Sequence, residues 1–268
     1  MNNDAIGVFD SGIGGLTTVK ALNKILPNEN IIYFGDTARI PYGTKSRETV
    51  VKYAQQDIEF LLNHGVKMII AACGTVSSVV GNKSSINGVP FSGVLLPAVQ
   101  TACSATRNGK VGVIGTPATI KSGAYGRAIK NINPHITIYG KACPMFVPLV
   151  ENGYTDRNNQ VTRIIAEEYL TPIKNEGVDT LIMGCTHYPI IEDIIRDIMG
   201  ENVRLISPGE EAGKFAEMCL TEKDLLSERS EPGENQFFVS DSVELFEENV
   251  KLFLGHEIKG EATCVTVG

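Results

Sequence analysis

The sequence lacks the features that would place this protein in a membrane, on nucleic acid or around a zinc ion. No apolar run approaches the length of a membrane-spanning helix. The N-terminal residues show no basic segment followed by an apolar core, so we expect no signal peptide. The formal net charge of -7 disfavours binding to nucleic acid or to an anionic membrane surface.

The cysteines also lack a pattern that would pair them or bind a metal. The six thiols are scattered along the chain without the close spacings of a zinc site. We therefore expect reduced cysteines in a cytoplasmic protein. Cys103, Cys143, Cys219 and Cys264 carry no further signal of their own, and we interpret them as packing residues.

What the chain does contain is a regular alternation of apolar β-rich runs and helical stretches. Its 268 residues, 43% of them hydrophobic and 21% charged, suffice for one large or two medium globular domains. The apolar runs are continuous rather than alternating, as expected for parallel strands covered on both faces. The pattern predicts an α/β fold with doubly wound parallel sheets. The first strands are expected at Ala5–Asp10, Ile31–Gly35 and Val66–Ala72, and the helices between them at Gly14–Ile25 and Arg47–His64.

This strand pattern occurs twice. Val111–Thr116 resembles Ile6–Ser11, Ile136–Gly140 resembles Ile31–Gly35, and Gly177–Cys185 resembles Gly65–Cys73. The first two pairs are 105 positions apart and the third is 112 positions apart. Three matches in one order predict an internal duplication, with two similar domains related by a pseudo-twofold axis and a cleft between them.

The boundaries between the two domains are expected at prolines that follow apolar strands. Pro97 and the pair Ser207-Pro208 are the crossing points, so that residues 1–97 plus 208–268 form the first domain and 98–207 the second. Ser207 and Glu210 also read as a capping box. Gln236–Ser240 reads as a further strand, followed by a last helix that returns to the first domain, and Leu225–Asn235 as a polar surface loop.

The duplication indicates a chemical role for two of the cysteines. Cys73 and Cys185 close equivalent apolar runs, and ligands of open α/β sheets bind at the carboxyl ends of the strands. Two thiols on opposite sides of one pocket suit the inversion of a carbon centre, because a thiolate can remove a proton while a thiol delivers one. A free thiol has a pKa of about 8.5 and needs help to ionise, for which Asp10 and His187 are the nearby acid–base groups.

The glycine-rich loop after the first strand is a weaker signal. The stretch Asp10–Gly15 (DSGIGG) lacks the G-x-G-x-x-G order of a dinucleotide site and the Lys-Ser/Thr of a P-loop, which disfavours a nucleotide. Its backbone N–H groups at a helix N-terminus could hold a carboxylate instead.

Taken together, these stretches resemble one known family, the glutamate racemases of the aspartate/glutamate racemase superfamily. The resemblance runs from the first strand to the last helix. Its most specific parts are the stretches Gly35–Gly43 and Gly184–Pro189. The matching stretches are Phe9–Gly15 (FDSGIGG), Gly35–Gly43 (GDTARIPYG), Cys143–Glu151 (CPMFVPLVE), Gly184–Pro189 (GCTHYP) and Phe238–Asp241 (FVSD).

The resemblance implies an activity and a set of site residues. It implies interconversion of L- and D-glutamate without metal, pyridoxal phosphate or nucleotide, supplying D-glutamate for peptidoglycan. Cys73 and Cys185 would be the catalytic thiols, with Asp10 assisting the first and Glu151 and His187 near the second. The family includes homodimers and monomers. The implied substrate-binding residues are Asp10, Ser11, Pro41, Tyr42, Gly43, Gly74, Thr75, Thr186 and His187.

One position departs from the family pattern. The family has asparagine after the first cysteine, where this chain has Gly74. The loss of a side-chain amide costs about 0.5–1.5 kcal/mol per hydrogen bond, so we expect asparagine at this position to tighten glutamate binding. The departure leaves two alternatives open: another enzyme of the superfamily, such as an aspartate racemase or a thiol-dependent decarboxylase, or a non-catalytic ligand-binding protein on the same scaffold.

Overall fold

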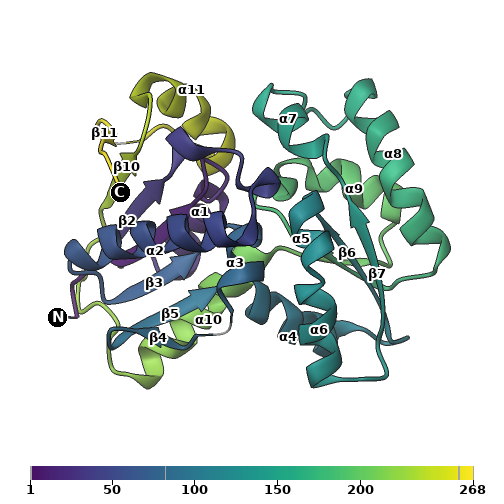
Figure 1. Ribbon diagram of the computed structural model, residues 1–268, viewed down its shortest axis with the longest axis horizontal. Coiled ribbons are helices and arrows are strands. Elements are labelled where there is room, and N and C mark those ends of the chain that lie inside the picture. Colours follow the sequence, from purple (N-terminus) through teal and green to yellow (C-terminus); the bar gives the residue numbers. More distant parts are fainter. Residues whose placement is uncertain (1, 82, 259, 268) are drawn as a thin grey trace.

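The chain forms two lobes, each built on its own β-sheet (Figure 1). The computed structural model describes residues 2–81, 83–258 and 260–267. The first sheet has the strand order β11-β10-β2-β1-β3-β5-β4, and all of its neighbours are parallel except β4 and β5. Its strands are β1 (Ile6–Asp10), β2 (Ile31–Gly35), β3 (Met68–Ala71), β4 (Ser85–Ile86), β5 (Val89–Gly93), β10 (Asn235–Val239) and β11 (Thr263–Cys264).

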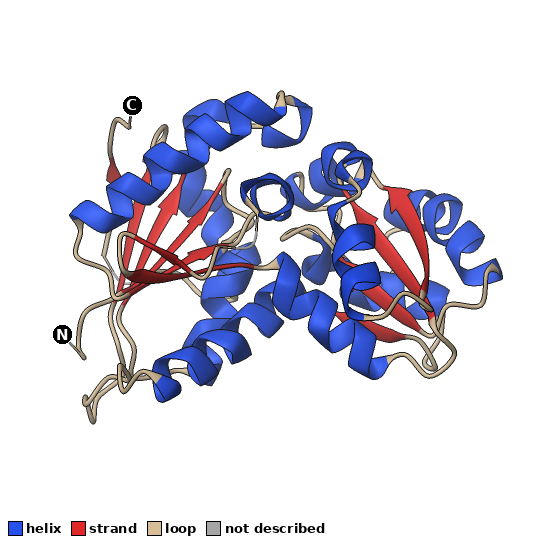
Figure 2. Ribbon diagram, turned by 60° about the horizontal axis from the view of Figure 1, so that its bottom comes forward, coloured by secondary structure: helices blue, strands red, loops and turns tan. Residues whose placement is uncertain are grey.

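The second sheet is parallel throughout, with the order β7-β6-β8-β9. Helices cover both faces of each sheet (Figure 2), so the predicted α/β fold with parallel sheets is confirmed. The second-lobe strands are β6 (Lys110–Gly115), β7 (Thr137–Ala142), β8 (Thr180–Met183) and β9 (Arg204–Ile206).

Helices link the strands within each lobe. No helix in the described part of the chain is long and apolar enough to span a membrane. The α-helices are α1 (Leu16–Ile25), α2 (Arg47–Asn63), α3 (Gly74–Val80), α4 (Leu95–Ala105), α5 (Pro117–Ser122), α6 (Ala124–Ile132), α7 (Phe146–Glu151), α8 (Gln160–Asn175), α9 (Glu192–Met199), α10 (Pro208–Glu222) and α11 (Val243–Leu254). The 3-10 turns are η1 (Thr37–Arg39), η2 (Tyr42–Thr44) and η3 (Tyr188–Ile191).

The strand and helix boundaries follow from local physical chemistry. Every residue of β1, β2 and β3 is buried, as the continuous apolar runs require. Helix α2 begins where the Ser46 hydroxyl accepts the backbone N–H of Thr49. The capping box expected at α10 is wrong, because the Ser207 side chain makes no capping hydrogen bond, although Pro208 does open the helix.

The two sheets repeat one topology. The order β2-β1-β3-β5 in the first lobe corresponds to β7-β6-β8-β9 in the second. Met68 pairs with Ile6, and Thr180 pairs with Val111, which agrees with the expected 112-residue spacing of the third strands. The second strands differ from expectation. Ile31 pairs with Ile6, but Ile138, not Ile136, pairs with Val111, so this strand is shifted by two residues.

Helix α4 carries the chain from one lobe to the other. It contacts α10 and β5 on one side and α6, β8 and β9 on the other. Residue 97, expected to end the first domain, therefore lies inside this helix, and the division at 97 and 207 stays a prediction. The C-terminal strand β10 pairs with β2 in the first sheet.

A buried ion pair fastens the loop after α10 to the first lobe. Lys67 Nζ lies 2.5 Å from Glu29 Oε2, and both side chains are almost completely buried. The ammonium also donates to the carbonyl of Leu225 at 2.8 Å, and the backbone N–H of Ser227 donates to Glu29 Oε1 at 2.7 Å. The pair thus joins three segments that are distant in sequence.

Removing one partner of this pair should be costly. We expect Glu29→Ala to lower the free energy of unfolding by about 3–5 kcal/mol, because it leaves the Lys67 ammonium buried without its carboxylate. The exposed pair Lys214–Glu210 is the control; Glu210→Ala should cost less than about 1 kcal/mol. Urea unfolding measures both, and equal losses in the two variants would contradict a structural role for the buried pair.

Candidate active site

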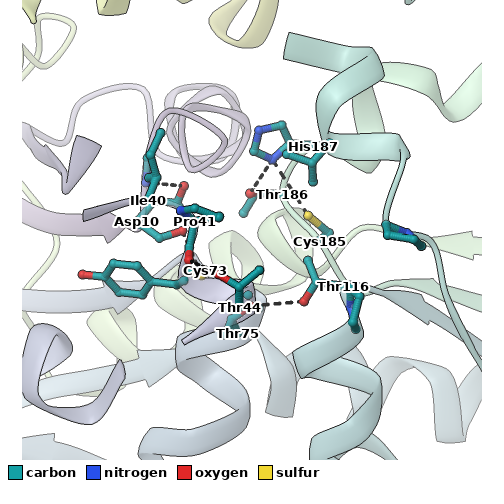
Figure 3. A pocket seen from close by; sticks show the side chains of 18 of the residues that line it. Asp10, Ile40, Pro41, Thr44, Cys73, Thr75, Thr116, Cys185, Thr186 and His187 are labelled. Carbon is teal, nitrogen blue, oxygen red and sulfur yellow. Dashed lines mark hydrogen bonds between the residues drawn. The ribbon is translucent and has the colours of Figure 1, made fainter. Parts of the chain in front are cut away.

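The two lobes face each other around a cavity of about 380 Å³ at the carboxyl ends of their parallel strands. Figure 3 shows side chains entering it from both lobes. All the site residues expected from the sequence line this cavity: Asp10, Ser11, Pro41, Tyr42, Gly43, Cys73, Gly74, Thr75, Glu151, Cys185, Thr186 and His187. In the described chain, no group of three or more His, Cys, Asp or Glu side chains is arranged to hold a metal ion.

Cys73 forms the wall of the cavity on the first lobe. It follows β3 and is the residue at which α3 begins, with 6% of its surface exposed. Its Sγ lies 3.4 Å from the hydroxyl of Ser11. Burial, and to a lesser extent the nearby charge of Asp10, raise the pKa of the Cys73 thiol to about 12. Cys73 is therefore a neutral thiol at neutral pH.

Asp10 holds the glycine-rich loop in place. Its Oδ2 accepts the backbone N–H groups of Gly12 and Gly15, at 3.3 and 3.1 Å. These two N–H groups are thus not free for a ligand carboxylate, and the expectation that other N–H groups of the loop bind one stays a prediction. Asp10 Oδ1 is buried and has no hydrogen-bond partner among the described residues. Burial raises the pKa of Asp10, against the lowering effect of the His187 charge and of these N–H groups.

Cys185 forms the opposite wall, in a different environment. Its Sγ lies 3.8 Å from Nδ1 of His187, and His187 Nε2 lies 2.9 Å from Glu151 Oε1 (Figure 3 labels the cysteine and the histidine). Burial alone would lower the pKa of His187, but its hydrogen bonds to Cys185 and Glu151 outweigh this and raise the pKa to about 10. At neutral pH the ring is an imidazolium that can donate to the sulfur and the carboxylate together.

The comparisons with known proteins agree with this geometry. Residues 6–216 match the family model for Asp/Glu/Hydantoin racemase. The chain belongs to this family. Within it, the chain is 46% identical over 238 residues to a glutamate racemase from Geobacter metallireducens, covering 88% of this chain and 87% of that protein.

Solved structures place the chain in the same group. The crystal structure of a glutamate racemase from Francisella tularensis in complex with D-glutamate has a TM-score of 0.89 and 40% identity, covering 99% of this chain and 98% of that one. The glutamate racemase isoform RacE1 from Bacillus anthracis has a TM-score of 0.92 and 34% identity, with the same two coverages. The resemblance to the glutamate racemases that the motifs indicated is confirmed.

Among the further residues that line this racemase cavity are Thr116 and Cys143, to which the sequence assigned no role in the site. Thr116 lies 105 positions after Ser11, so the internal repeat could have identified it. Its Oγ1 lies 3.3 Å from Oγ1 of Thr75, across the junction between the lobes (Figure 3). Cys143, interpreted as a packing residue, is buried but also lines the cavity. Burial raises the pKa of its thiol to about 12, and its Sγ donates to the carbonyl of Lys141.

Tyr42 contributes to the cavity without offering its hydroxyl. That hydroxyl donates to Asp36 and also lies within hydrogen-bond distance of Asp57 Oδ2 inside the first lobe. Arg39 joins the same two carboxylates, with Nε 2.6 Å from Asp36 and Nη2 2.9 Å from Asp57. Burial and the charge of Asp36 raise the pKa of Asp57 to about 8. This network holds the Gly35–Gly43 stretch, and its role is to position the cavity wall.

At Gly74 the backbone of the first lobe lies close to the backbone of the second lobe. A Cβ built on Gly74 would lie 2.4 Å from the carbonyl oxygen of Gly184 on the other lobe. Gly184 is equally constrained, because its own Cβ would lie 2.7 Å from the carbonyl oxygen of Ile114. An asparagine at 74 therefore requires this carbonyl to move, and its expected effect on glutamate binding stays a prediction.

This contact predicts a measurable penalty for the smallest side chain. We expect Gly74→Ala to lower the free energy of unfolding by about 1–3 kcal/mol, because a backbone carbonyl must move to admit the methyl group. Gly126→Ala is the control: its Cβ would meet no atom within 4 Å, and alanine favours the helix. Thermal unfolding compares the two. A Gly74→Ala protein as stable as the wild type would show that the contact is not enforced.

Proposed function

We propose that this protein interconverts L- and D-glutamate without a cofactor, by proton transfer between the α-carbon and two thiols on opposite sides of the substrate. The observation that carries the proposal is the presence of Cys73 and Cys185, from equivalent strand ends of the two lobes, at one cavity. Glutamate as the substrate rests on the relatives, one of which was crystallised with D-glutamate.

In each turnover one bond to the α-carbon breaks and another forms on the opposite face. A thiolate removes the α-proton, the electron pair stays on the carbon next to the carboxylate, and the opposite thiol delivers its proton. The product leaves the two thiols with exchanged protonation. The neutral Cys73 thiol suits the proton donor of the resting enzyme. Cys185, facing the His187 imidazolium, suits the proton acceptor, because the positive ring favours a neighbouring thiolate.

The remaining polar groups support the same chemistry. In the reverse direction Asp10 assists Cys73. Among the described residues, Asp10 Oδ1 has no hydrogen-bond partner, so it can accept a proton or bind the substrate ammonium. The hydroxyls of Ser11, Thr75 and Thr186 serve as donors to the substrate carboxylates. Glu151 holds the His187 ring through Nε2.

The alternatives are less well supported. A thiol-dependent decarboxylase needs one cysteine, and a second thiol with its own acid–base partners would have no task. A binding protein without activity was suggested by Gly74, but the close approach of Gly184 gives that glycine a structural reason. Supply of D-glutamate for peptidoglycan in the cytoplasm, and assembly as a homodimer, belong to this proposal through the family resemblance alone.

The two thiols should be needed equally. In D₂O without added cofactor, the wild-type protein should exchange the α-proton of glutamate with solvent and interconvert the enantiomers. Cys73→Ala and Cys185→Ala should each abolish interconversion, because one face of the α-carbon loses its proton carrier. Cys103→Ala, a half-buried thiol on α4 outside the cavity lining, should leave it intact. Proton NMR and circular dichroism follow exchange and interconversion.

Three outcomes would count against the proposal. Full activity in either single variant would end the two-thiol mechanism. Exchange of aspartate but not glutamate would change the substrate. Exchange of neither amino acid would favour the binding-protein alternative.

His187 should govern the response to pH. The pKa of His187 is raised from 6.5 to about 10 in the folded protein. The contribution of the ring to the free energy of unfolding is therefore fully present below about pH 6.5 and is lost as the pH rises through about 10. In urea unfolding, the stability difference between wild type and His187→Gln should therefore shrink from about pH 6 to about pH 10. The variant should also lose about 10²-fold or more in kcat. A difference that grows with pH would show that the ring is neutral when folded.

A further inference from the structure

Two buried tyrosines lie close to the catalytic groups without lining the cavity. Tyr33 is on β2 in the first lobe, Tyr188 is the first residue of η3 in the second, and both side chains are fully buried. The proposed mechanism gives neither of them a task. Burial raises the pKa of both phenols well above the ordinary value, so both hydroxyls keep their protons and act as hydrogen-bond donors.

The Tyr33 hydroxyl holds the glycine-rich loop around Asp10. It donates to the carbonyl of Gly12 at 2.7 Å, while the N–H of Gly12 donates to Asp10 Oδ2 at 3.3 Å. The Tyr33 ring also lies against Gly15, because a Cβ built on Gly15 would lie 3.0 Å from its Cε2. Gly15 is the second N–H donor to Asp10. The tyrosine therefore supports both N–H groups that orient the carboxylate of the Cys73 side.

The Tyr188 hydroxyl holds the segment that leads to Glu151. It donates to the carbonyl of Cys143 at 3.1 Å. Its ring packs edge-on against Phe146, the first residue of α7, with the ring centroids 5.1 Å apart. Glu151 is the last residue of this helix and bonds His187. The tyrosine therefore fixes the start of the helix whose end carries the carboxylate.

The Glu151 carboxylate depends on this support. Its only hydrogen-bond partner among the described residues is His187, and 38% of its side chain is exposed. Helix α7 has six residues, too few to keep its place without packing. Tyr188 follows His187 directly in the chain, so its bond to the segment before α7 ties the carboxylate and the imidazolium to each other from behind.

We propose that Tyr33 and Tyr188 are positioning residues, one for each side of the proton transfer. Tyr33 orients the carboxylate on the side of Cys73. Tyr188 orients the carboxylate and imidazolium on the side of Cys185. The inference rests on the proposed two-thiol racemisation and adds one residue to each half of it. The duplication does not account for the pair, because Tyr33 lies on the second strand of its lobe and Tyr188 follows the third.

Replacement by phenylalanine removes each hydroxyl and keeps the ring. Tyr33→Phe and Tyr188→Phe should each lower kcat for glutamate about tenfold, because the carboxylate loses its fixed position. KM should stay close to the wild-type value, because neither ring lines the cavity. Tyr125→Phe is the control and should keep the wild-type kcat. Its buried hydroxyl has no hydrogen-bond partner among the described residues, and its ring lies against Gly184, next to Cys185. Thermal unfolding verifies that the three variants are folded.

Deuterium isotope effects at the α-carbon show on which side each tyrosine acts. The two thiols deprotonate opposite enantiomers, so slower transfer at one thiol makes that step more rate-limiting in both directions. The effect on kcat/KM should then rise for the enantiomer that this thiol deprotonates and fall for the other. Tyr33→Phe and Tyr188→Phe should give opposite patterns. The same pattern in both, wild-type values in either, or a Tyr125→Phe protein that behaves like Tyr188→Phe would overturn the proposal.

The titration of His187 tests the second half without turnover. With Glu151 less firmly held, the imidazolium is less stabilised, and NMR should show a pKa of His187 roughly one pH unit lower in Tyr188→Phe than in the wild type. Tyr125→Phe should leave this pKa unchanged. Phe146→Leu, which removes the ring contact on α7, should lower it too and replaces Tyr188→Phe if that variant does not fold.

The outcomes separate this inference from the proposed function. An unchanged pKa of His187 in a folded Tyr188→Phe protein would overturn the role of the tyrosine, even where turnover is slower. A wild-type protein that racemises nothing would contradict the proposed function, and the titration would still decide what Tyr188 does. Wild-type racemisation that persists unchanged in both tyrosine variants would overturn the positioning role alone.

Discussion

The backbone contact between Gly74 and Gly184 is the constraint on which the arrangement of the site depends. Each glycine is the direct neighbour of one cavity cysteine, so the distance between the lobes at this point sets the distance between the thiols. Because the obstacle to a Cβ is a backbone carbonyl rather than a flexible side chain, the separation cannot be adjusted locally. Proton transfer depends on positions within fractions of an ångström, and a contact between main chains is the stiffest way to hold them.

The duplication explains why the thiols meet, but not why they differ. Cys73 and Cys185 end equivalent strands, yet their neighbours have diverged. The position of Asp10 in the first repeat corresponds to Gly115 in the second, where the acid–base partner is His187, two residues after the cysteine. A symmetric pair would give each thiol the same tendency to ionise. In the proposed mechanism, the burial of Cys73 and the imidazolium beside Cys185 make the two thiols unequal and favour Cys185 as the first proton acceptor.

Much of the fold and of the candidate site could be predicted from the sequence. Buried parallel strands leave a clear apolar pattern, and the motifs lie at the carboxyl ends of these strands. The elements that escaped prediction lack such a pattern. Strand β7 is half exposed, so its apolar residues do not mark its register, and the two-residue shift at Ile138 has no local signal. The role of Gly74 depends on a carbonyl 110 positions away. Thr116 was accessible through the repeat, since it follows Ser11 by 105 residues.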